Sequence, residues 1–121
     1  MTDRIMILDD SRDRHAPIAA LHPNDDIEHC YSAAEALYAL MTHDRFDRVY
    51  LDHDLGEEMS GCRIATAIAH MEPHMRPLGA VAHSVNPDGA KRMEQILWED
   101  AGVAVCVVPF YQLVTVKGRD D

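Results

Sequence analysis

The chain contains few cysteines. The three that it has, Cys30, Cys62 and Cys106, are spread over 121 residues, and no two form a C-x-x-C pair. An odd, widely spaced set predicts neither a disulfide framework nor a zinc knuckle. This usage fits a reducing compartment best, so we expect a cytoplasmic protein.

The shortage of positive charge restricts the partners. Lysine and arginine number 11 against 21 aspartates and glutamates, and the formal net charge is -10. Such a surface repels a phosphate backbone and disfavours extended nucleic acid as a partner. A small phosphorylated ligand or nucleotide stays compatible with this charge, because one nearby cation or helix end can outweigh a distant field. The same acidity also serves solubility alone.

Long hydrophobic runs are absent as well. No apolar stretch approaches the ~18 residues that span a membrane, and the first residues show no signal-peptide pattern, so no membrane partner is predicted. The length suits one domain, without repeat or linker. We therefore predict a single domain over residues 1–121, with a core at about residues 3–110 and a C-terminal tail at residues 111–121.

Short apolar runs, each stopped by polar or turn-forming residues, predict the strands. Runs of this kind are typical of a buried parallel sheet. A fifth, weaker run is expected at an edge of the sheet. The four clear runs and the edge run are Arg4–Leu8, Asp47–Leu51, Gly79–Ala82, Val103–Val108 and Ile27–Tyr31.

Helical patterns lie between these runs. Ser32 and Glu35 form a capping box, and Leu37, Leu40 and Met41 follow as an apolar face at helical spacing. Further helices are predicted over Gly61–Met71 and from Asn86-Pro87 to Gly102, where asparagine caps the start and glycine ends the helix.

The first and last segments are less regular. Pro17 prevents a long helix from Ser11, so we predict a first helix that starts near Asp13 with Pro17 in or near its first turn. After the last strand, Tyr111–Lys117 alternates like an extended edge segment and replaces a full fifth helix. Such an edge could pair with a second copy, so a homodimer is one expected assembly.

The alternation of strands and helices predicts an α/β fold. Right-handed crossovers then give a single doubly wound domain, with a five-stranded parallel sheet flanked by helices and a short or extended C-terminal segment. In such sheets, ligands bind at the carboxyl ends of the strands. The residues that follow the strands are therefore the candidates for a site.

Carboxylates follow two of the predicted strands. Asp9 and Asp10 end the first, and Asp52 ends the third. Three carboxylates in one cleft repel one another unless a cation lies among them, and oxygen ligands favour Mg²⁺. His53 and His83, if they joined the ligands, would shift the preference towards Mn²⁺. The alternative is that these aspartates only cap a helix and end a strand.

An anion site is predicted beside the carboxylates. Ser84, Asn86 and the amide of Gly89 lie at the start of a helix, where free amides and the helix dipole attract phosphate. Lys91 is close enough in sequence to add positive charge. An ordinary capped helix would carry the same residues.

These residues resemble the receiver domains of response regulators over about residues 3–110. The resemblance rests on the run Ile5–Asp10, the run Val49–Asp52 with Gly61 downstream, and a hydroxyl after the fourth strand. In that family the acidic pair and the central aspartate hold Mg²⁺, and the central aspartate accepts a phosphoryl group. The resemblance assigns these roles to Asp9, Asp10 and Asp52.

Two departures point to a divergent branch. Receivers carry a lysine before the proline after the fifth strand, where it contacts the phosphoryl group, and here Val108 precedes Pro109. The segments Leu51–Gly56 and His83–Ala90 are similar to the cyclic-phosphate-processing receiver domains. That resemblance implies a phosphoesterase role.

The first functional hypothesis is an enzyme. A Mg²⁺- or Mn²⁺-dependent phosphoesterase would act on a small nucleotide or a cyclic-phosphate end, with Asp52 or a water oriented by the metal. His53 or His83 would move protons near neutral pH. Ser84, Asn86 and the helix start would hold phosphate oxygens, and Asp54 would bind substrate beside Asp52, like the paired aspartates of aspartate-based phosphatases.

Two other classes stay open from the sequence. The first is a receiver that a histidine kinase phosphorylates on Asp52 and that signals through a surface. The second is a catalytically silent domain that binds a ligand or oligomerises.

Overall fold

The computed structural model describes residues 2–56, 60–84 and 87–113. Five strands alternate with helices along this chain. The strands are β1 Arg4–Leu8, β2 Asp26–Cys30, β3 Arg48–Asp52, β4 Gly79–His83 and β5 Ala104–Val107. The helices are α1 Arg12–Ala19, α2 Ala33–Thr42, α3 Ser60–His70 and α4 Pro87–Gln95, with a 3-10 turn η1 Pro73–Met75 and a π-helical turn η2 Ile96–Asp100.

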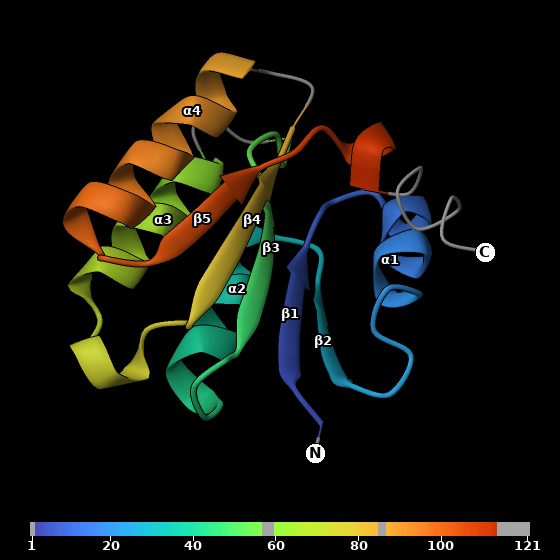
Figure 1. Cartoon of the computed structure of the whole chain (residues 1–121), viewed down its shortest axis with the longest axis horizontal. Helices are drawn as coiled ribbons and strands as arrows, with labels where there is room; N and C mark the ends of the chain where they lie inside the picture. The colour runs from blue at the N-terminus through green and yellow to red at the C-terminus, as the bar shows by residue number, and fades with distance from the viewer. Residues whose placement is uncertain (1, 57–59, 85–86, 114–121) are drawn as a thin grey trace.

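All neighbouring strands are parallel, in the order β2-β1-β3-β4-β5 (Figure 1). The chain proceeds in one direction from β1 to β2 and in the other from β3 to β5, so the order reverses between β1 and β3. Crevices at such switch points bind the ligands of doubly wound sheets. The predicted α/β domain is confirmed, and its five strands lie within one or two residues of their predicted ends.

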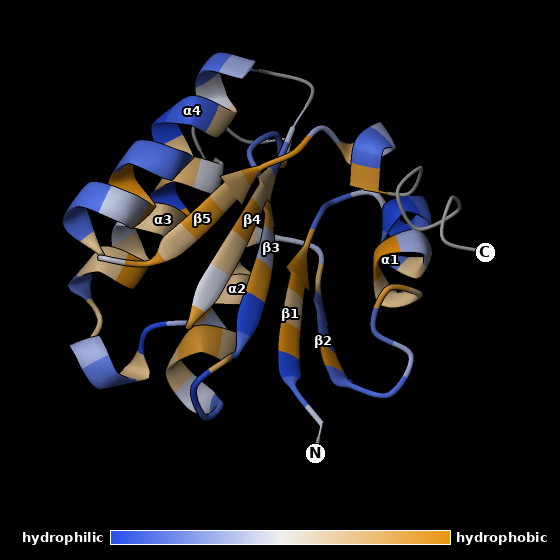
Figure 2. Cartoon of the chain, viewed as in Figure 1, coloured by the Kyte–Doolittle hydropathy of each residue, from blue (hydrophilic) through white to orange (hydrophobic). Residues whose placement is uncertain are grey.

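Two hydrophobic clusters cover the two faces of the sheet. Met6, Leu8 and Leu51 pack towards α2, α3 and α4, while Ile7 and Tyr50 pack towards Ile18 of α1. Figure 1 shows the three helices on one face and α1 near the opposite one. Because the middles of β1 and β3 are buried on both faces, their inner residues are mostly apolar, while Arg4 and Arg48 stand at the starts of the strands, where the hydropathy colouring turns blue (Figure 2).

The start of α2 confirms the capping box, with one difference in a partner. The Ser32 hydroxyl accepts from the Glu35 amide at 3.2 Å, and the Glu35 carboxylate accepts from the amide of Tyr31 at 3.0 Å. The predicted apolar face was wrong at Met41, which is 82% exposed. Met41 is rotated by about 100° from the buried Leu40, so a side chain there points away from the sheet.

The prediction for α1 was wrong in one respect. The helix begins at Arg12, so Pro17 lies inside it and beyond the first turn. Its missing N–H removes the hydrogen bond to the carbonyl of Asp13. A helix this short tolerates the loss because Ile18 and His15 anchor it by burial.

The last strand and the segment after it also differ from expectation. The run Val103–Val108 was predicted as a buried strand, but β5 lies at an edge of the sheet, and Ala104 and Cys106 are exposed. Residues 110–113 are helical instead of extended, with the amides of Gln112 and Leu113 donating to the carbonyl of Pro109 at 3.0 and 3.3 Å. A helical turn brings Phe110 and Leu113 together against the α1 face, which an alternating strand would not do. Residues 114–117 lie outside the described part, so the homodimer stays a prediction.

None of the helices in the described ranges combines the length and hydrophobicity that crossing a membrane requires.

One arginine ties the ends of two helices together. The Arg76 guanidinium donates to the carbonyls of Ala69, Met71 and Ala101 at 2.8, 3.1 and 2.9 Å. The Ala69 carbonyl lies in the last turn of α3, and those of Met71 and Ala101 directly follow α3 and η2, where carbonyls lack helical donors. Gly102 follows with φ of 67°, the left-handed conformation of a helix C-terminus, as predicted.

We predict that Arg76→Met lowers the free energy of unfolding by about 2 kcal/mol or more, because three carbonyls lose a charged donor. Urea unfolding followed by circular dichroism measures the change. Arg63→Met on the exposed side of α3 is the matched control and should stay within about 0.5 kcal/mol of the parent. Equal stability of the two variants would show that Arg76 does not hold these ends.

Candidate functional site

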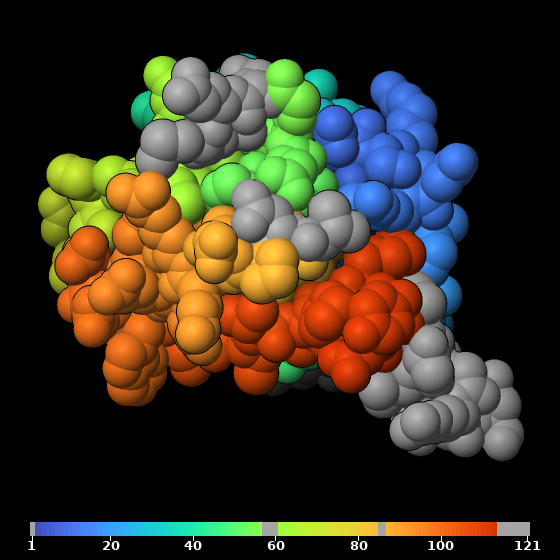
Figure 3. Space-filling model, turned by 90° about the horizontal axis from the view of Figure 1, so that it is seen from above, coloured from blue at the N-terminus to red at the C-terminus, as the bar shows by residue number. Residues whose placement is uncertain are grey.

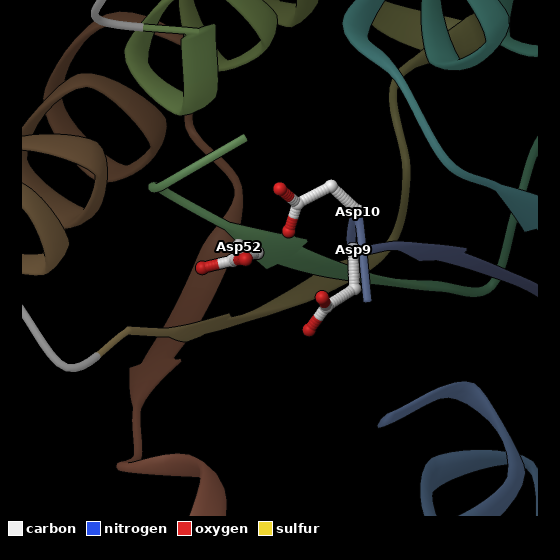
Figure 4. Close-up of side chains that lie close together, drawn as sticks. All are labelled: Asp9, Asp10 and Asp52. Atoms are coloured by element: carbon white, nitrogen blue, oxygen red, sulfur yellow. The ribbon is translucent and has the colours of Figure 1, made fainter. Parts of the chain in front are cut away.

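Three carboxylates converge at the carboxyl edge of the sheet. Asp9 and Asp10 leave β1, and Asp52 ends the adjacent β3, where Leu8 pairs with Leu51. One oxygen from each aspartate lies within 4.8 Å of the others, and Figure 4 shows the three side chains grouped at the ends of β1 and β3. The predicted convergence of this acidic triad is confirmed.

Asp9 is held as an anion by its neighbours. Its Oδ1 accepts from the Ser11 amide at 2.8 Å, and its Oδ2 accepts from His83 Nε2 at 3.0 Å. Burial acts to raise the pKa of Asp9, but the hydrogen bonds from His83 and Ser11 and the charges of His83 and Arg14 outweigh it, so the pKa lies below its usual value. The proton of the triad is therefore not on Asp9.

Asp52 keeps a proton more readily than Asp9 does. Burial, and then the negative charge of Asp9, raise the pKa of Asp52 to about 7. Its Oδ1 accepts from the Asp54 amide at 3.2 Å, whereas its Oδ2 is buried and accepts no hydrogen bond from any residue that the structure describes. A buried oxygen of this kind is costly unless a cation or proton satisfies it.

The residues fit a divalent ion. The donors are carboxylate oxygens from three aspartates, one of them an orphaned buried oxygen, and hard oxygen donors favour Mg²⁺. Each of the two candidate histidines uses one ring nitrogen in a hydrogen bond to a carboxylate: His83 to Asp9, and His53 to Asp54. The donor set is thus of the kind that receiver domains use for Mg²⁺.

His83 contacts the triad from the buried interior of the protein. Its side chain is fully buried, its Nε2 contacts Asp9, and its ring lies 6.3 Å from that of Phe110. Within the described residues its Nδ1 has no hydrogen-bond partner. This placement suits orientation of Asp9 better than contact with a substrate.

A hydrogen-bonded chain joins the ends of β3 and β4. His53 Nδ1 contacts Asp54 Oδ1 at 3.0 Å, and the Ser84 hydroxyl donates to Asp54 Oδ2 at 3.0 Å. The hydrogen bond from His53 is the largest cause that lowers the pKa of Asp54. Asp54 is therefore ionised and connects an imidazole to a hydroxyl beside Asp52.

Two glycines allow the neighbouring helices to approach this chain. A Cβ at position 89 would lie 2.5 Å from His53 Nδ1, and one at position 61 would lie 2.5 Å from the Cα of His53 and 2.8 Å from the carbonyl oxygen of Asp52. Gly89 of α4 thus packs on the imidazole itself. The first turn of α3 is likewise set against the end of β3, where the Gly61 amide donates to the His53 carbonyl at 3.2 Å.

The remaining predicted residues are placed differently. Lys91 lines a groove between α4, η2 and β5 together with Trp98 and Val105, and within the part of the chain that the structure describes it makes no ion pair with the triad. Asn86 lies outside the described residues. Figure 3 looks down on the carboxyl edge of the sheet. On this face lie the start of α1, the residues after β3, the region of β4 and α4, and the red segment of residues 107–113.

Sequence reasoning missed two residues of α1. His15 is buried and its Nε2 donates to the carbonyl of Asp9 at 2.8 Å. Arg14 Nη1 lies 3.7 Å from Asp9 Oδ2 and 3.7 Å from Asp52 Oδ2. The available signal was their position one helical turn after the acidic pair, which places the start of α1 over the carboxyl edge.

The sequence matches the model of the cyclic-phosphate processing receiver domain over residues 4–99. The chain belongs to this family. No match was found among curated proteins. The family assignment and the triad together identify a receiver domain with an acidic site of the receiver type.

Solved structures of other receiver proteins have the same fold as this chain. The phosphorylated cyanobacterial phytochrome response regulator RcpA is 18% identical, with a TM-score of 0.75 over 99% of this chain and 92% of that chain. A CheY-like response regulator receiver domain protein from Methanospirillum hungatei JF-1 is 16% identical, with a TM-score of 0.66 over 99% of this chain and 94% of that chain. At these identities the likeness shows the fold alone.

We predict that Asp52 destabilises the metal-free domain as pH rises. Its pKa is about 7 when folded against an ordinary value of 3.8, so the folded state binds the proton more tightly. The stability that this group contributes at low pH is lost between about pH 4 and pH 7. At pH 8 the free energy of unfolding of Asp52→Asn, measured by urea unfolding, should therefore exceed that of the parent by about 2 kcal/mol or more. At pH 5 the difference in the free energy of unfolding should be smaller.

Saturating Mg²⁺ should stabilise the parent at pH 8 and leave Asp52→Asn almost unchanged, because the variant loses a ligand oxygen. Asp88→Asn, on the exposed start of α4, removes one negative charge away from the triad and serves as the control. Parallel pH profiles of the parent and Asp52→Asn would contradict the assignment of the proton to Asp52.

Proposed function

We propose that this receiver domain is a divalent-metal-dependent phosphoesterase that opens a cyclic phosphate, on a small nucleotide or at the end of an oligonucleotide. The observation that carries the proposal is the chain from His53 through Asp54 to Ser84, hydrogen-bonded beside Asp52. An acid–base group held by a carboxylate next to a metal-type triad is what hydrolysis requires. The family assignment supports the same substrate class.

Asp9, Asp10 and Asp52 would hold Mg²⁺ or Mn²⁺. When bound, the ion would neutralise these carboxylates and withdraw electron density from a phosphoryl oxygen. His83 and the Ser11 amide hold the carboxylate of Asp9, and His15 holds its carbonyl. Asp9 therefore needs little reorganisation when a ligand enters.

His53 is the group suited to move the proton. Because Asp54 is ionised, it accepts from His53 Nδ1, which leaves Nε2 to accept a proton. The side chain of His53 is 14% exposed, whereas that of His83 is fully buried. An imidazole with one nitrogen held by a carboxylate and the other without a proton can take a proton from water and return it.

The reaction balances with water as the only co-reactant. The water oxygen bonds to phosphorus while one P–O ester bond of the cyclic phosphate breaks. His53 Nε2 accepts the proton that the water loses and donates it to the leaving oxygen. The product is a phosphomonoester with a free hydroxyl, and the imidazole is neutral again.

The start of α4 would support the phosphate. Gly89 brings the first turn of α4 against His53, so the helix N-terminus lies beside the proton-moving group. Asn86 and the amide of Gly89 are groups that would hold phosphate oxygens there, and Ser84 would join them by exchanging its hydrogen bond to Asp54 for one to the phosphate. A net charge of -10 still disfavours an extended nucleic acid as the substrate.

We predict that the purified protein hydrolyses members of a panel of cyclic nucleotides and oligonucleotides ending in a cyclic phosphate, and that EDTA abolishes this activity. His53→Asn should lower kcat by about 100-fold or more, while Mg²⁺ affinity changes by less than about threefold, because the imidazole is not a ligand. His83→Gln should instead weaken Mg²⁺ binding by about tenfold, since it orients Asp9.

The exposed His74 provides the matched control, and His74→Gln should retain parental activity. Hydrolysis is measured by chromatography of the products and metal binding by calorimetry. No turnover with any member of the panel and either metal would refute the proposed function, and full activity of His53→Asn would refute the role of that residue.

A phosphoacceptor receiver is the second candidate, because the same triad suits phosphorylation of Asp52. Val108 stands where receivers carry a phosphate-binding lysine, and its amide donates to the Ala82 carbonyl at 3.0 Å. Its side chain can supply no charge to a phosphoryl group. This difference favours the enzyme over the switch.

We therefore predict that acetyl phosphate or beryllium fluoride with Mg²⁺ produces neither a stable adduct on Asp52 nor dimerisation. Mass spectrometry and analytical ultracentrifugation measure the two effects. Val108→Lys is the informative companion, because it restores the charge of a receiver at this position. A long-lived aspartyl phosphate with dimerisation in the parent would support the signalling receiver instead.

A further inference from the structure

We propose that Arg14 binds the phosphate anion of the ligand at this site, and that it does so in place of the lysine that Val108 replaces. The nature of the natural ligand rests on the proposed function, whereas the binding of an anion rests on the geometry of Arg14 alone.

Arg14 is placed over the two buried carboxylates of the triad. Its Nη1 lies 3.7 Å from Asp9 Oδ2 and 3.7 Å from Asp52 Oδ2, and 34% of its side chain is exposed. The guanidinium thus lies beside the acidic oxygens, while part of the Arg14 side chain is open to solvent. A ligand that enters from the carboxyl edge meets this cation at the triad.

The donors of Arg14 are largely unused. At 3.7 Å the contacts to Asp9 and Asp52 are ion pairs without hydrogen-bond length. Within the ranges that the structure describes, the guanidinium donates no hydrogen bond, although it carries five N–H groups. A planar group with free donors matches the oxygens of a phosphate in a bidentate arrangement.

The start of α1 fixes the position of this side chain. The Ser11 amide donates to Asp9 Oδ1 at 2.8 Å, and His15 Nε2 donates to the Asp9 carbonyl at 2.8 Å, so residues on both sides of Arg14 are anchored to Asp9. On the side chain itself, the guanidinium carbon lies 5.4 Å from the centre of the Phe110 ring. Arg14 is therefore held at the site before any ligand arrives.

Charge balance explains why an anion belongs there. Asp52 is only 1% exposed, and its Oδ2 accepts no hydrogen bond from the described residues. The site is therefore incomplete as it stands. A divalent ion among the carboxylates would take over the role of counter-ion, and the charge of Arg14 would then be available to the phosphate.

Other described cations are placed elsewhere. Lys91 lines the outer groove of α4, and the guanidinium of Arg12 lies over the ring of Tyr31 at 4.1 Å. Neither forms an ion pair with the triad in the part of the chain that the structure covers. Arg12 lies two residues from Arg14 in the same helix, which makes it a matched control.

Arg14→Gln and Arg12→Gln test the proposal on the full chain by calorimetry. Mg²⁺ is titrated first, and inorganic phosphate is then titrated into protein saturated with Mg²⁺. Arg14→Gln should bind phosphate about 10-fold or more weakly than the parent, because a charged donor is lost. The same variant should bind Mg²⁺ at least as tightly as the parent, since a competing cation has left the carboxylates, and this binding also shows that the variant is folded. Arg12→Gln should leave both affinities within about twofold, and Arg14→Lys should bind phosphate with intermediate affinity.

The two titrations separate a ligand-binding role from a structural one. Phosphate affinity of Arg14→Gln within twofold of the parent, or no phosphate binding by the Mg²⁺-saturated parent, would overturn the proposal. Weaker Mg²⁺ binding by Arg14→Gln together with unchanged phosphate affinity would show that Arg14 only supports the carboxylates. These outcomes do not depend on turnover. If only the proposal for Arg14 fails, the protein still hydrolyses cyclic phosphates and Arg14→Gln binds phosphate like the parent. If only the proposed function fails, the parent binds phosphate through Arg14 but hydrolyses none of the cyclic phosphates.

Discussion

The mutual repulsion of Asp9, Asp10 and Asp52 is the constraint on which the rest of the site depends. Two adjacent parallel strands end in carboxylates, two of them buried, and the fold sustains them by treating them differently. Asp9 is stabilised as an anion by an imidazole, an amide and a guanidinium, while Asp52 has a raised pKa and an oxygen that receives no hydrogen bond from the described residues. The fold thereby keeps one position ready for a cation, at a cost to the metal-free protein.

The surrounding groups follow from this asymmetry. His83 contacts the carboxylate of Asp9 and His15 contacts its carbonyl, and both imidazoles are buried. Asp54 lies outside the triad, where solvent reduces repulsion, and it can be ionised and hold His53. Under the proposed function, the inner carboxylates of the triad would hold a metal, and an outer set, His53 and Asp54, would serve acid–base chemistry. A receiver that only stores a phosphoryl group has no need of the outer set.

Much of this could be predicted from the sequence, for a physical reason. Apolar runs that end in aspartate specify both a buried parallel strand and the chemistry at its end, so the sheet and the convergence of Asp9, Asp10 and Asp52 followed from one pattern. Contacts between elements were harder to predict. Arg14 and His15 belong to a short helix with a proline inside and no amphipathic pattern, and their roles depend on how α1 sits on the sheet. The alternation in Tyr111–Leu113 was misleading, because burial of Phe110 and Leu113 on the α1 face determined the local conformation.

The packing of Gly89 on the ring of His53 has a consequence for how such a domain can change over time. A side chain of any size at position 89 would enter the imidazole, and one at position 61 would enter the backbone of β3. The adjacent Asp88 and Lys91 are exposed, so substitution there meets no such barrier. Substitution is therefore restricted at the two glycines and accepted at the charged residues beside Gly89. Among descendants that retain the function, we expect the site to be marked as much by these two residues without side chains as by its aspartates and histidines.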